Sequence, residues 1–362
     1  MTDLHAERRL TMLEEITQAP GIPGYESVVA ETMSRWMEDI AEVQYDGLGS
    51  AIFTLPGQSE EPRVMLAGHM DEVGFMVKRI TPEGFIKFLP IGGWWDQVLL
   101  GNRVIIKTLT GDVPGIIGSK PPHILSKEDR EKVVKAKDMF IDIGATSDKV
   151  AQETMGVRPG DPILPFSPFA RMANEDLLMS KAWDDRVGCA LIIDVFHRLK
   201  DGQFPGTLIG VGTVQEEVGL RGAQTSAELV RPDVAIALEV SIAGDMPGGN
   251  PDEASDKLGE GPALLLYDRS MIPNLKLRDL VMEVARVNDI PLQTSVMAAG
   301  GTDAGRIHLH RGGVPSVVLG VPSRYIHDQA GLISLKDYER ALDLLAALIQ
   351  ALDADTVRSL RP

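Results

Sequence analysis

Isolated histidines and carboxylates follow four apolar runs of this chain, at the positions where those runs end. In chain order the residues are His69 and Asp71, Glu216 and Glu217, Glu239, and His327. Short runs of Val, Ile, Leu and Ala bounded by Gly or Pro are typical of buried strands. In an open α/β sheet, ligands bind beyond the carboxyl ends of the strands. Because His, Asp and Glu are the usual ligands of hydrolytic metal ions, the pattern predicts one shared metal site.

His69 and Asp71 form a His-x-Asp pair at the first of these strand ends. Neutral imidazole is a good ligand for zinc or cobalt, and its second ring nitrogen needs a partner that fixes its orientation. The carboxylate of Asp71 is suitably placed in sequence to be that partner. The alternative is a surface histidine beside an aspartate that caps a helix.

Asp184 and Asp185 stand at the expected opening of a helix, in the segment WDDRVG. One carboxylate there can bridge two cations, which a site with ions about 3.5–4 Å apart requires. The alternative is structural, since acidic residues favour the first turn of a helix through capping and the helix dipole.

Glu216 and Glu217 are neighbours, so on extended backbone their side chains point in opposite directions. One can then reach the metal ions while the other acts as a general base on the attacking water. A Glu pair is also common on solvated loops. Glu239 interrupts an apolar strand, where an unpaired carboxylate is costly unless it binds a cation or lies beyond the sheet rim in water. His327 alone could be an ordinary loop histidine, and the metal-site prediction depends on the convergence of all five segments.

The segments that position these residues alternate between strands and helices after residue 181. We expect helices near residues 3–18, 27–41, 183–200, 218–230, 274–289 and 335–357. Together with the apolar strands they predict an α/β fold, with a largely parallel, doubly wound sheet and helices on both faces.

The sequence pattern changes in residues 73–169, where short expected strands are separated by turns such as TPEG and TGDVPG. This pattern predicts a small inserted all-β unit, with an exposed loop and a short helix near residues 120–136. The first 70 residues alone are too few for a robust core. We therefore expect a discontinuous catalytic α/β domain, residues 1–72 and 170–362, interrupted by a β-barrel-like domain, residues 73–169.

Composition restricts the partners of the protein. Of its 362 residues 44% are hydrophobic and 24% charged, and the formal net charge of −16 disfavours nucleic acid. The single cysteine permits no intrachain disulfide. The sequence shows neither a signal-peptide core nor an apolar run of 18 residues, so we expect a cytoplasmic protein without membrane contact.

At these residues the chain resembles the M42 family of metallo-aminopeptidases, the glutamyl and deblocking group that is sometimes labelled cellulase. The resemblance covers essentially the whole chain and depends on the ordered motifs APGIPGYE, AGHMDEVGF, GSKPPHILSKEDREKV, FIDIGA, KAWDDRVG, TVQEEVGLRGA, GGTDAGRIHLHRGGVPS and SRYIH. It implies that the ligands of one metal ion are His69, Asp184 and residue 239, and that those of the other are Asp184, Glu217 and His327. Asp184 would bridge, Glu216 would be the general base, and Asp71 would support His69.

One departure from the family pattern concerns Glu239, because the family usually has Asp at this position. Glutamate can still bind a metal ion, but its extra methylene moves the carboxylate by about one C–C bond. The resemblance further implies that the inserted unit mediates dimerisation and that the assembly is a tetrahedral homododecamer with its active sites facing an inner cavity. His123, in KPPH, is either an oxyanion donor to a neighbouring active site or an ordinary loop residue.

The function expected from these residues and the resemblance is a metal-dependent aminopeptidase that acts on peptides with a free N-terminus. Its cofactors would be two divalent ions per subunit, zinc or cobalt with manganese as a third choice. A related acylase or carboxypeptidase would need a cationic pocket, for which Arg324 is the candidate. A glycosidase using Glu216 and Glu217, and a non-catalytic assembly module, are the remaining alternatives. The preference for the first side chain of the substrate stays open.

Overall fold

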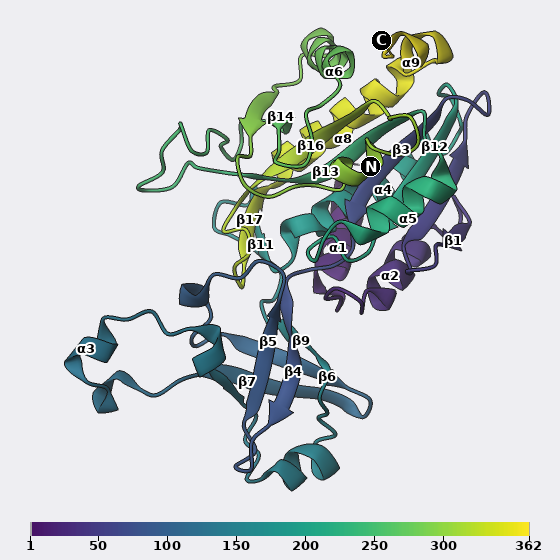
Figure 1. The fold of residues 1–362 in the computed structure, drawn as a ribbon. Helices are drawn as coiled ribbons and strands as arrows, with labels where there is room; N and C mark the ends of the chain where they lie inside the picture. Colours follow the sequence, from purple (N-terminus) through teal and green to yellow (C-terminus); the bar gives the residue numbers. More distant parts are fainter. Residues whose placement is uncertain (1, 362) are drawn as a thin grey trace.

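Two separate β-sheets organise the protein, an open sheet of 11 strands and a closed barrel of strands β4, β5, β8, β7, β6 and β9. The structure is a computed structural model that describes residues 2–361, with side chains described from residue 6 onwards. Figure 1 shows the barrel as a distinct body beside the large sheet, joined to it by extended connections. Among the helices within the described residues, none has the length and apolarity needed to span a bilayer.

The large sheet is mixed. Its strands are β1 (Val43–Tyr45), β2 (Ala51–Pro56), β3 (Arg63–His69), β10 (Ala170–Arg171), β11 (Leu177–Ser180), β12 (Thr207–Thr213), β13 (Val234–Ile242), β14 (Ala263–Tyr267), β15 (Gln293–Val296), β16 (Ser316–Arg324) and β17 (Gly331–Ser334). They lie in the order β1-β2-β12-β3-β13-β16-β17-β11-β10, and β14 pairs with both β16 and β15. The central strands β12, β3, β13 and β16 are parallel, whereas β2 and β17 pair antiparallel on either side of them.

The expectation of a largely parallel sheet therefore holds for the central strands and for the β14–β15 pair, and is wrong for the outer strands. For three of the antiparallel pairs the reason is the length of the connections. A short turn can only join antiparallel neighbours. β1 and β2, β10 and β11, and β16 and β17 are all joined by short segments, and each pair is antiparallel.

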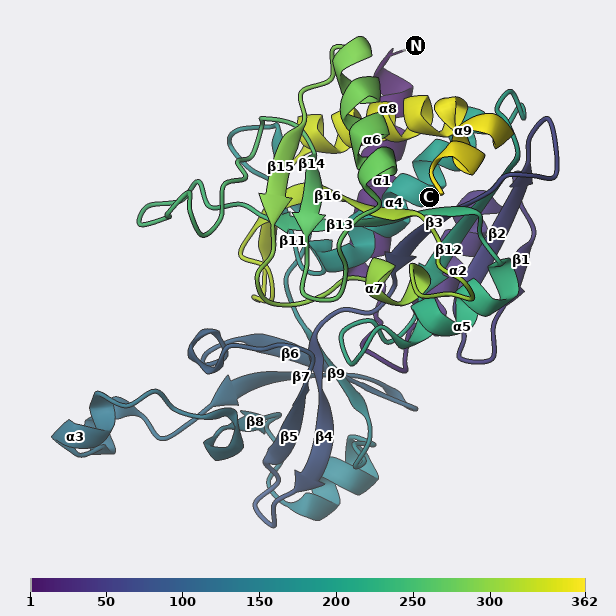
Figure 2. The ribbon, with the colours of Figure 1, turned by 45° about the horizontal axis from the view of Figure 1, so that its top comes forward.

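Helices cover both faces of the large sheet. They are α1 (Thr2–Gln18), α2 (Ser27–Met37), α4 (Trp183–Leu199), α5 (Arg221–Val230), α6 (Leu275–Val287), α7 (Ala304–Ile307), α8 (Leu335–Ala351) and α9 (Ala354–Ser359). α4 packs on β3 and β13, and α1, α2 and α8 pack around α4, while α5 and α7 contact the sheet from the other side. Figure 2 shows α8 and α7 on opposite sides of β13 and β16.

Side chains of β3 alternate between the two apolar cores. Val64 and Leu66 belong to the core around α4, and Met65 and Ala67 belong to the core around α5. Successive side chains of a strand point to opposite faces. A strand buried on both faces is therefore apolar throughout, which is the pattern that the sequence displays.

Several helices differ from the expectation: α2 ends at Met37 rather than near residue 41, and α5 begins at Arg221 rather than near residue 218. Two further helices are broken or irregular. In α4 the dihedral angles of Asp184 (φ −81°, ψ 104°) and Asp185 (φ −123°, ψ 43°) are not helical. Asp185 instead accepts the backbone N–H of Gly188 at 3.0 Å, as an N-cap does. The expected helix over 335–357 is in fact α8 and α9, because Asp353 caps a new helix by accepting the N–H of Thr356 at 2.7 Å.

The barrel has its own apolar core. Its strands are β4 (Gly74–Ile80), β5 (Ile86–Ile91), β6 (Arg103–Thr108), β7 (Gly111–Gly118), β8 (Phe140–Asp142) and β9 (Pro162–Pro165). All six lie in sequence between β3 and β10, and their inward side chains form a core separate from that of the large sheet. The long connection between β7 and β8 holds the short helix α3 (Lys127–Arg130), as the sequence predicted.

The parallel strands bring their carboxyl ends to one edge of the large sheet. β12, β3, β13 and β16 are consecutive neighbours there. β3 continues at this edge into β4, so the barrel begins directly beside the strand ends. The residues that follow the apolar runs are thereby gathered where the two sheets meet.

Candidate metal centre

His69, the last residue of β3, lies at the centre of a cluster of carboxylates. Its Nε2 is 3.0 Å from Oδ1 of Asp184, 3.8 Å from Oε2 of Glu216 and 3.9 Å from Oε2 of Glu239. The imidazole is only 1% exposed. The three acids come from the start of α4, the segment after β12, and β13. Four chain segments thus meet at one buried imidazole.

Asp184 faces two histidines with its two oxygens. Oδ1 is 3.0 Å from Nε2 of His69, and Oδ2 is 3.3 Å from Nε2 of His327. Nε2 of His327 is also 3.1 Å from Oε1 of Glu217, and its Nδ1 is 2.8 Å from the main-chain oxygen of Gly93. Gly93 follows the barrel strand β5, so the barrel connection fixes the orientation of this ring. A carboxylate shared between two imidazoles has the arrangement expected of a bridging ligand.

The potential ligand atoms form three overlapping groups, each with its atoms within 4.8 Å of one another. These groups are Asp184, Glu217 and His327; His69, Asp185 and Glu239; and His69, Glu216 and Glu217. The first is the set that the family resemblance implies for one ion. In the second, Asp185 stands where the resemblance implies Asp184.

Asp185 is the weaker ligand candidate of the two neighbouring aspartates. Its Oδ2 accepts the backbone N–H of His69 and its Oδ1 that of Gly188, both at 3.0 Å. Both oxygens therefore have main-chain partners. Asp184 faces His69 with an oxygen that accepts no main-chain hydrogen bond, so the contacts favour Asp184 as the residue next to the ions.

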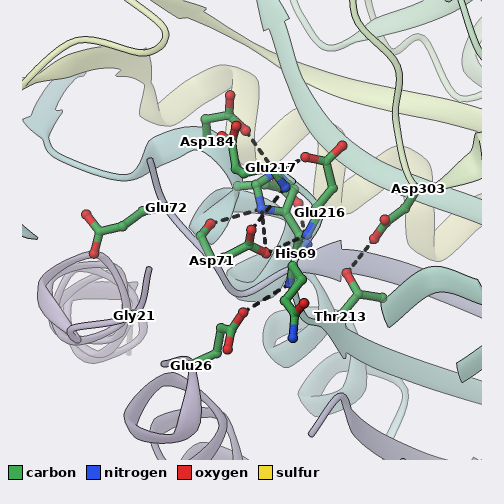
Figure 3. A network of polar contacts seen from close by, with 12 residues as sticks. Gly21, Glu26, His69, Asp71, Glu72, Asp184, Thr213, Glu216, Glu217 and Asp303 are labelled. Atoms are coloured by element: carbon green, nitrogen blue, oxygen red, sulfur yellow. Dashed lines mark hydrogen bonds and ion pairs between the residues drawn. The ribbon is translucent and has the colours of Figure 1, made fainter. Parts of the chain in front are cut away.

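Asp71 supports the cluster differently from the expectation. Nδ1 of His69 is 3.0 Å from the main-chain oxygen of Asp71 and 3.6 Å from its carboxylate. The carboxylate oxygens instead accept the backbone N–H groups of Glu216 and Glu217, each at 3.0 Å (Figure 3). Asp71 thus orients the histidine through its carbonyl group and holds the Glu216–Glu217 segment through its side chain.

Glu26 extends this support by one residue. Its Oε1 accepts the N–H of Gln215 at 3.0 Å and that of Gly24 at 2.8 Å. Three successive N–H groups, of residues 215–217, are therefore each held by a buried carboxylate. The sequence analysis missed Glu26, although it is the last residue of the motif APGIPGYE. Figure 3 shows Glu26 and Asp71 on the same side of this segment.

Burial and charge shift the proton affinities of the cluster. Burial raises the pKa of Glu216 and of Glu239 well above the usual carboxylate value. Burial alone would also raise the pKa of Asp184, but hydrogen bonds from His327 and His69 lower it. Burial alone would lower the pKa of His69, but the surrounding acids raise it well above its usual range. The four acidic side chains of the cluster therefore carry more negative charge than its two imidazoles can neutralise.

The donor set fits divalent cations. Imidazole nitrogens and carboxylate oxygens are ligands that zinc, cobalt and manganese accept. The buried carboxylates lack enough positive charge among the neighbouring side chains, and bound ions would supply it. The ring nitrogens of His69 and His327 that face the acids have no carbonyl partner, whereas the opposite nitrogens do. This division of roles is usual for histidines that bind metal.

A cavity of about 880 Å³ opens beside the cluster. The cluster forms its acidic end, and most of the remaining wall is apolar. Arg324 does not contribute a free positive charge, because its Nε and Nη2 lie 2.7 and 2.6 Å from the two oxygens of Asp245. Arg269 does line the cavity, and the sequence analysis missed it.

His123 does not join the cluster within one chain. It is an exposed residue of a short 3₁₀ turn, Pro122–Ile124. The same connection carries α3, which Figure 1 shows extending away from the large sheet. A role at a neighbouring subunit is therefore the only catalytic role still open to it.

One protein family and several known proteins are similar to this chain. The family model described as M42 glutamyl aminopeptidase matches residues 49–344. The putative aminopeptidase FrvX of Escherichia coli K12 is 42% identical over 97% of both chains. The glutamyl aminopeptidase of Lactococcus lactis is 35% identical over 96% of this chain and 98% of its own. The lysyl aminopeptidase of Pyrococcus furiosus is 32% identical over 94% and 96%, respectively.

Solved structures with the same fold include two TET peptidases. The TET aminopeptidase of a marine sediment archaeon, Thaumarchaeota archaeon SCGC AB-539-E09, is 51% identical, with a TM-score of 0.96 over 98% of this chain and 99% of its own. The TET1 peptidase of Pyrococcus horikoshii, described as able to assemble into a tetrahedron or a large octahedral shell, is 34% identical, with a TM-score of 0.86 over 95% and 100%.

Proposed function

Because the chain belongs to the M42 glutamyl aminopeptidase family and is a metal-dependent aminopeptidase, we propose that hydrolysis takes place at the cluster around His69 and Asp184. The observation that carries this proposal is the position of Asp184 between the two histidines. One oxygen of Asp184 faces His69, on β3, and the other faces His327, beyond β16.

Two divalent ions are the proposed cofactors. His69, Asp184 and Glu239 would hold one ion, and Asp184, Glu217 and His327 the other. When bound, the ions polarise the scissile carbonyl group and lower the pKa of the attacking water. The nitrogen and oxygen donors suit zinc, cobalt or manganese.

Glu216 is the proposed general base. Oε1 of Glu217 lies 3.1 Å from Nε2 of His327, whereas the contact of Glu216 with a histidine is longer, 3.8 Å from Oε2 to Nε2 of His69. Glu216 therefore lies farther from its neighbouring histidine nitrogen than Glu217 does. Burial raises the pKa of Glu216, and its carboxylate would stay ionised beside the positive charge of the bound ions, so that it can accept a proton from water. The same carboxyl group would then return that proton to the leaving amine.

The N-terminus of the peptide would lie at the acidic end of the cavity. A free ammonium group is attracted by the carboxylates of the cluster, and the first side chain then extends into the rest of the cavity. A blocked N-terminus lacks this charge. Peptides with a free N-terminus are therefore the proposed substrates.

We further propose that residues 1–72 and 170–362 form the catalytic domain and that residues 73–169 form a domain for self-association. The separate core of the barrel supports this division. The P. horikoshii relative, which can assemble into a tetrahedron or a large octahedral shell, supports self-association. A related TET1 structure that is described as a dodecamer supports a homododecamer. Light scattering of the purified protein tests the assembly. A stable monomer would contradict it.

Glu216→Gln tests the proposed chemistry. The variant keeps the size of the side chain but cannot take up a proton. We expect the metal content of the protein to persist while kcat falls by about 10²–10⁴-fold. A chelator should abolish wild-type activity, and added zinc or cobalt should restore it. Normal turnover by the variant would remove the assignment of the base.

A further inference from the structure

Beside the proposed metal centre lies a group of three charged side chains, Glu72, Lys181 and Arg186, which we call the Glu72 network. All three are buried. Nζ of Lys181 lies 2.6 Å from Oε1 of Glu72, and Nη2 of Arg186 lies 3.3 Å from the same oxygen. Within the described residues, none of the three belongs to a group of potential ligand atoms. The proposed hydrolysis gives them no part in the chemistry.

The Glu72 network joins the two segments that carry His69 and Asp184. Glu72 follows His69 by three residues. Lys181 precedes Asp184 by three residues, and Arg186 follows it by two. One carboxylate therefore ties the segment of Asp184 to that of His69 at two points, one on either side of Asp184. Figure 3 shows the side chain of Glu72 directed away from His69, so its carboxylate lies outside the cluster.

The network borders the metal centre directly. Glu72 and Lys181 line a small cavity whose wall also includes Asp184 and His327. Asp184 is the residue that faces both histidines of the centre. A shift of the network would therefore reach the proposed bridging ligand without an intervening element.

The main chain around the network is fixed as well. Nη1 of Arg186 donates to the main-chain oxygens of Ile16 and Ala19, at 2.7 and 2.8 Å, and Nη2 donates to that of Gly21 at 3.1 Å. The backbone N–H of Glu72 donates to the same oxygen of Gly21 at 2.9 Å. The guanidinium group and the backbone of Glu72 are therefore both anchored to the turn that follows α1. This anchoring does not depend on bound ions.

Such a network contributes geometry more than stability. A buried ion pair gains little over apolar side chains of the same volume, because each charge loses its hydration. Its hydrogen bonds do fix the distance and the direction between the segments that they join. Ligands that are held in place before an ion arrives bind it more tightly, since less conformational freedom is lost on binding.

We propose that Glu72 is a positioning residue of the metal centre. Through Lys181 and Arg186 it holds Asp184 at the distance from His69 that two bridged ions need, before the ions bind. Glu72 touches neither the ions nor the substrate, and its effect passes through Asp184. This role rests on the proposed function, because it presupposes that Asp184 bridges two ions.

Glu72→Gln tests the proposal, because it removes the charge and keeps the size of the side chain. We expect both ions to bind about 10–100-fold more weakly, the usual effect of changing a partner that orients a metal ligand. A competitive chelator titration measures this, and circular dichroism shows that the titrated variant is folded. Saturating cobalt should restore most of the lost kcat, because the ions then hold Asp184 themselves. KM should stay unchanged, since Glu72 does not contact the substrate.

Asp194→Asn is the matched control, because Asp194 is a buried acid that also lies near two cations. Its Oδ2 is 2.8 Å from Nε of Arg9, and its Oδ1 is 3.5 Å from Nη1 of Arg8. It belongs to α4, as Asp184 does, but stands ten residues farther along the chain. We expect this variant to lose stability in urea unfolding without any change in metal affinity.

Lys181→Met is the second variant, because it removes the shorter contact of Glu72 and leaves the contact with Arg186 in place. It should weaken the binding of both ions, and it decides the question if Glu72→Gln does not fold. A folded variant at either position with the metal affinity of the wild type would overturn the positioning role, as would an equal loss in Asp194→Asn. A wild type that binds no divalent ions would instead refute the proposed function.

Discussion

Asp71→Asn is the substitution that tests most sharply how the Glu216–Glu217 segment is held. Each oxygen of the Asp71 carboxylate accepts one backbone N–H at 3.0 Å, from Glu216 and from Glu217. Asparagine retains one acceptor oxygen and presents an NH₂ group in place of the other. One of the two N–H groups then loses its acceptor and faces a second donor. The main-chain carbonyl that contacts His69 is unchanged.

The magnitude follows from the lost bond. A hydrogen bond to a charged group contributes about 1.5–3 kcal/mol, and the side chain of Asp71 is fully buried. If this energy positions the general base and the neighbouring metal ligand, kcat falls by about 10- to 150-fold. The affinity for the ion at Glu217 should fall as well. Steady-state kinetics with an arylamide reporter and a competitive chelator titration measure the two effects.

Asp46→Asn is the control for this experiment. Asp46 is also buried, and its Oδ1 accepts the N–H groups of Leu48, Gly49 and Ser50 in a loop between β1 and β2. Its substitution should change kcat less than about twofold, since an amide oxygen can serve the same donors. If Asp71→Asn leaves kcat and metal affinity within threefold of the wild type, or if both variants lose activity equally, the reasoning is refuted.

Two further perturbations probe residues close to the cluster. Glu239→Gln removes the negative charge of a side chain 3.9 Å from His69, so we expect the ion at His69 to bind at least about tenfold more weakly, and unchanged metal titrations would contradict this. Burial raises the pKa of Glu26 from 4.5 to about 7, so the folded protein holds a proton there that the unfolded chain releases. The stability from this proton is complete below pH 4.5 and is lost as the pH rises through 7, by about 3 kcal/mol. Urea unfolding at pH 5 and pH 8 should therefore show Glu26→Gln gaining on the wild type at the higher pH, whereas parallel pH dependences would count against a buried, titrating Glu26.

Local sequence pattern was sufficient to find the residues at the strand ends. His69 follows a four-residue apolar run, and Glu239 interrupts one, so both stand out without knowledge of the fold. In the structure both lie within 4 Å of one another at the edge where the parallel strands end. The break before α9 also had a local signal, because Asp353 stands three residues before Thr356 in the spacing of a capping residue.

Contacts between distant segments could not be read from the sequence. Lys181 and Arg186 are buried and both contact Oε1 of Glu72, at 2.6 and 3.3 Å, across more than 100 residues. Whether an arginine is free or paired depends on such contacts. Arg324 looked available beside His327 until the fold brought Asp245 to it. The partner of the Asp71 carboxylate was likewise decided by β12 lying next to β3.

The central claim is that distant segments of the chain hold a pair of ions between His69 and His327. A crystal structure of the zinc- or cobalt-loaded protein, with anomalous data at the absorption edge of the metal, tests it directly. We predict two anomalous peaks per chain, one beside His69 and Glu239 and one beside Glu217 and His327, with Asp184 in contact with both. A single peak, or peaks that Asp184 does not touch, would contradict the account.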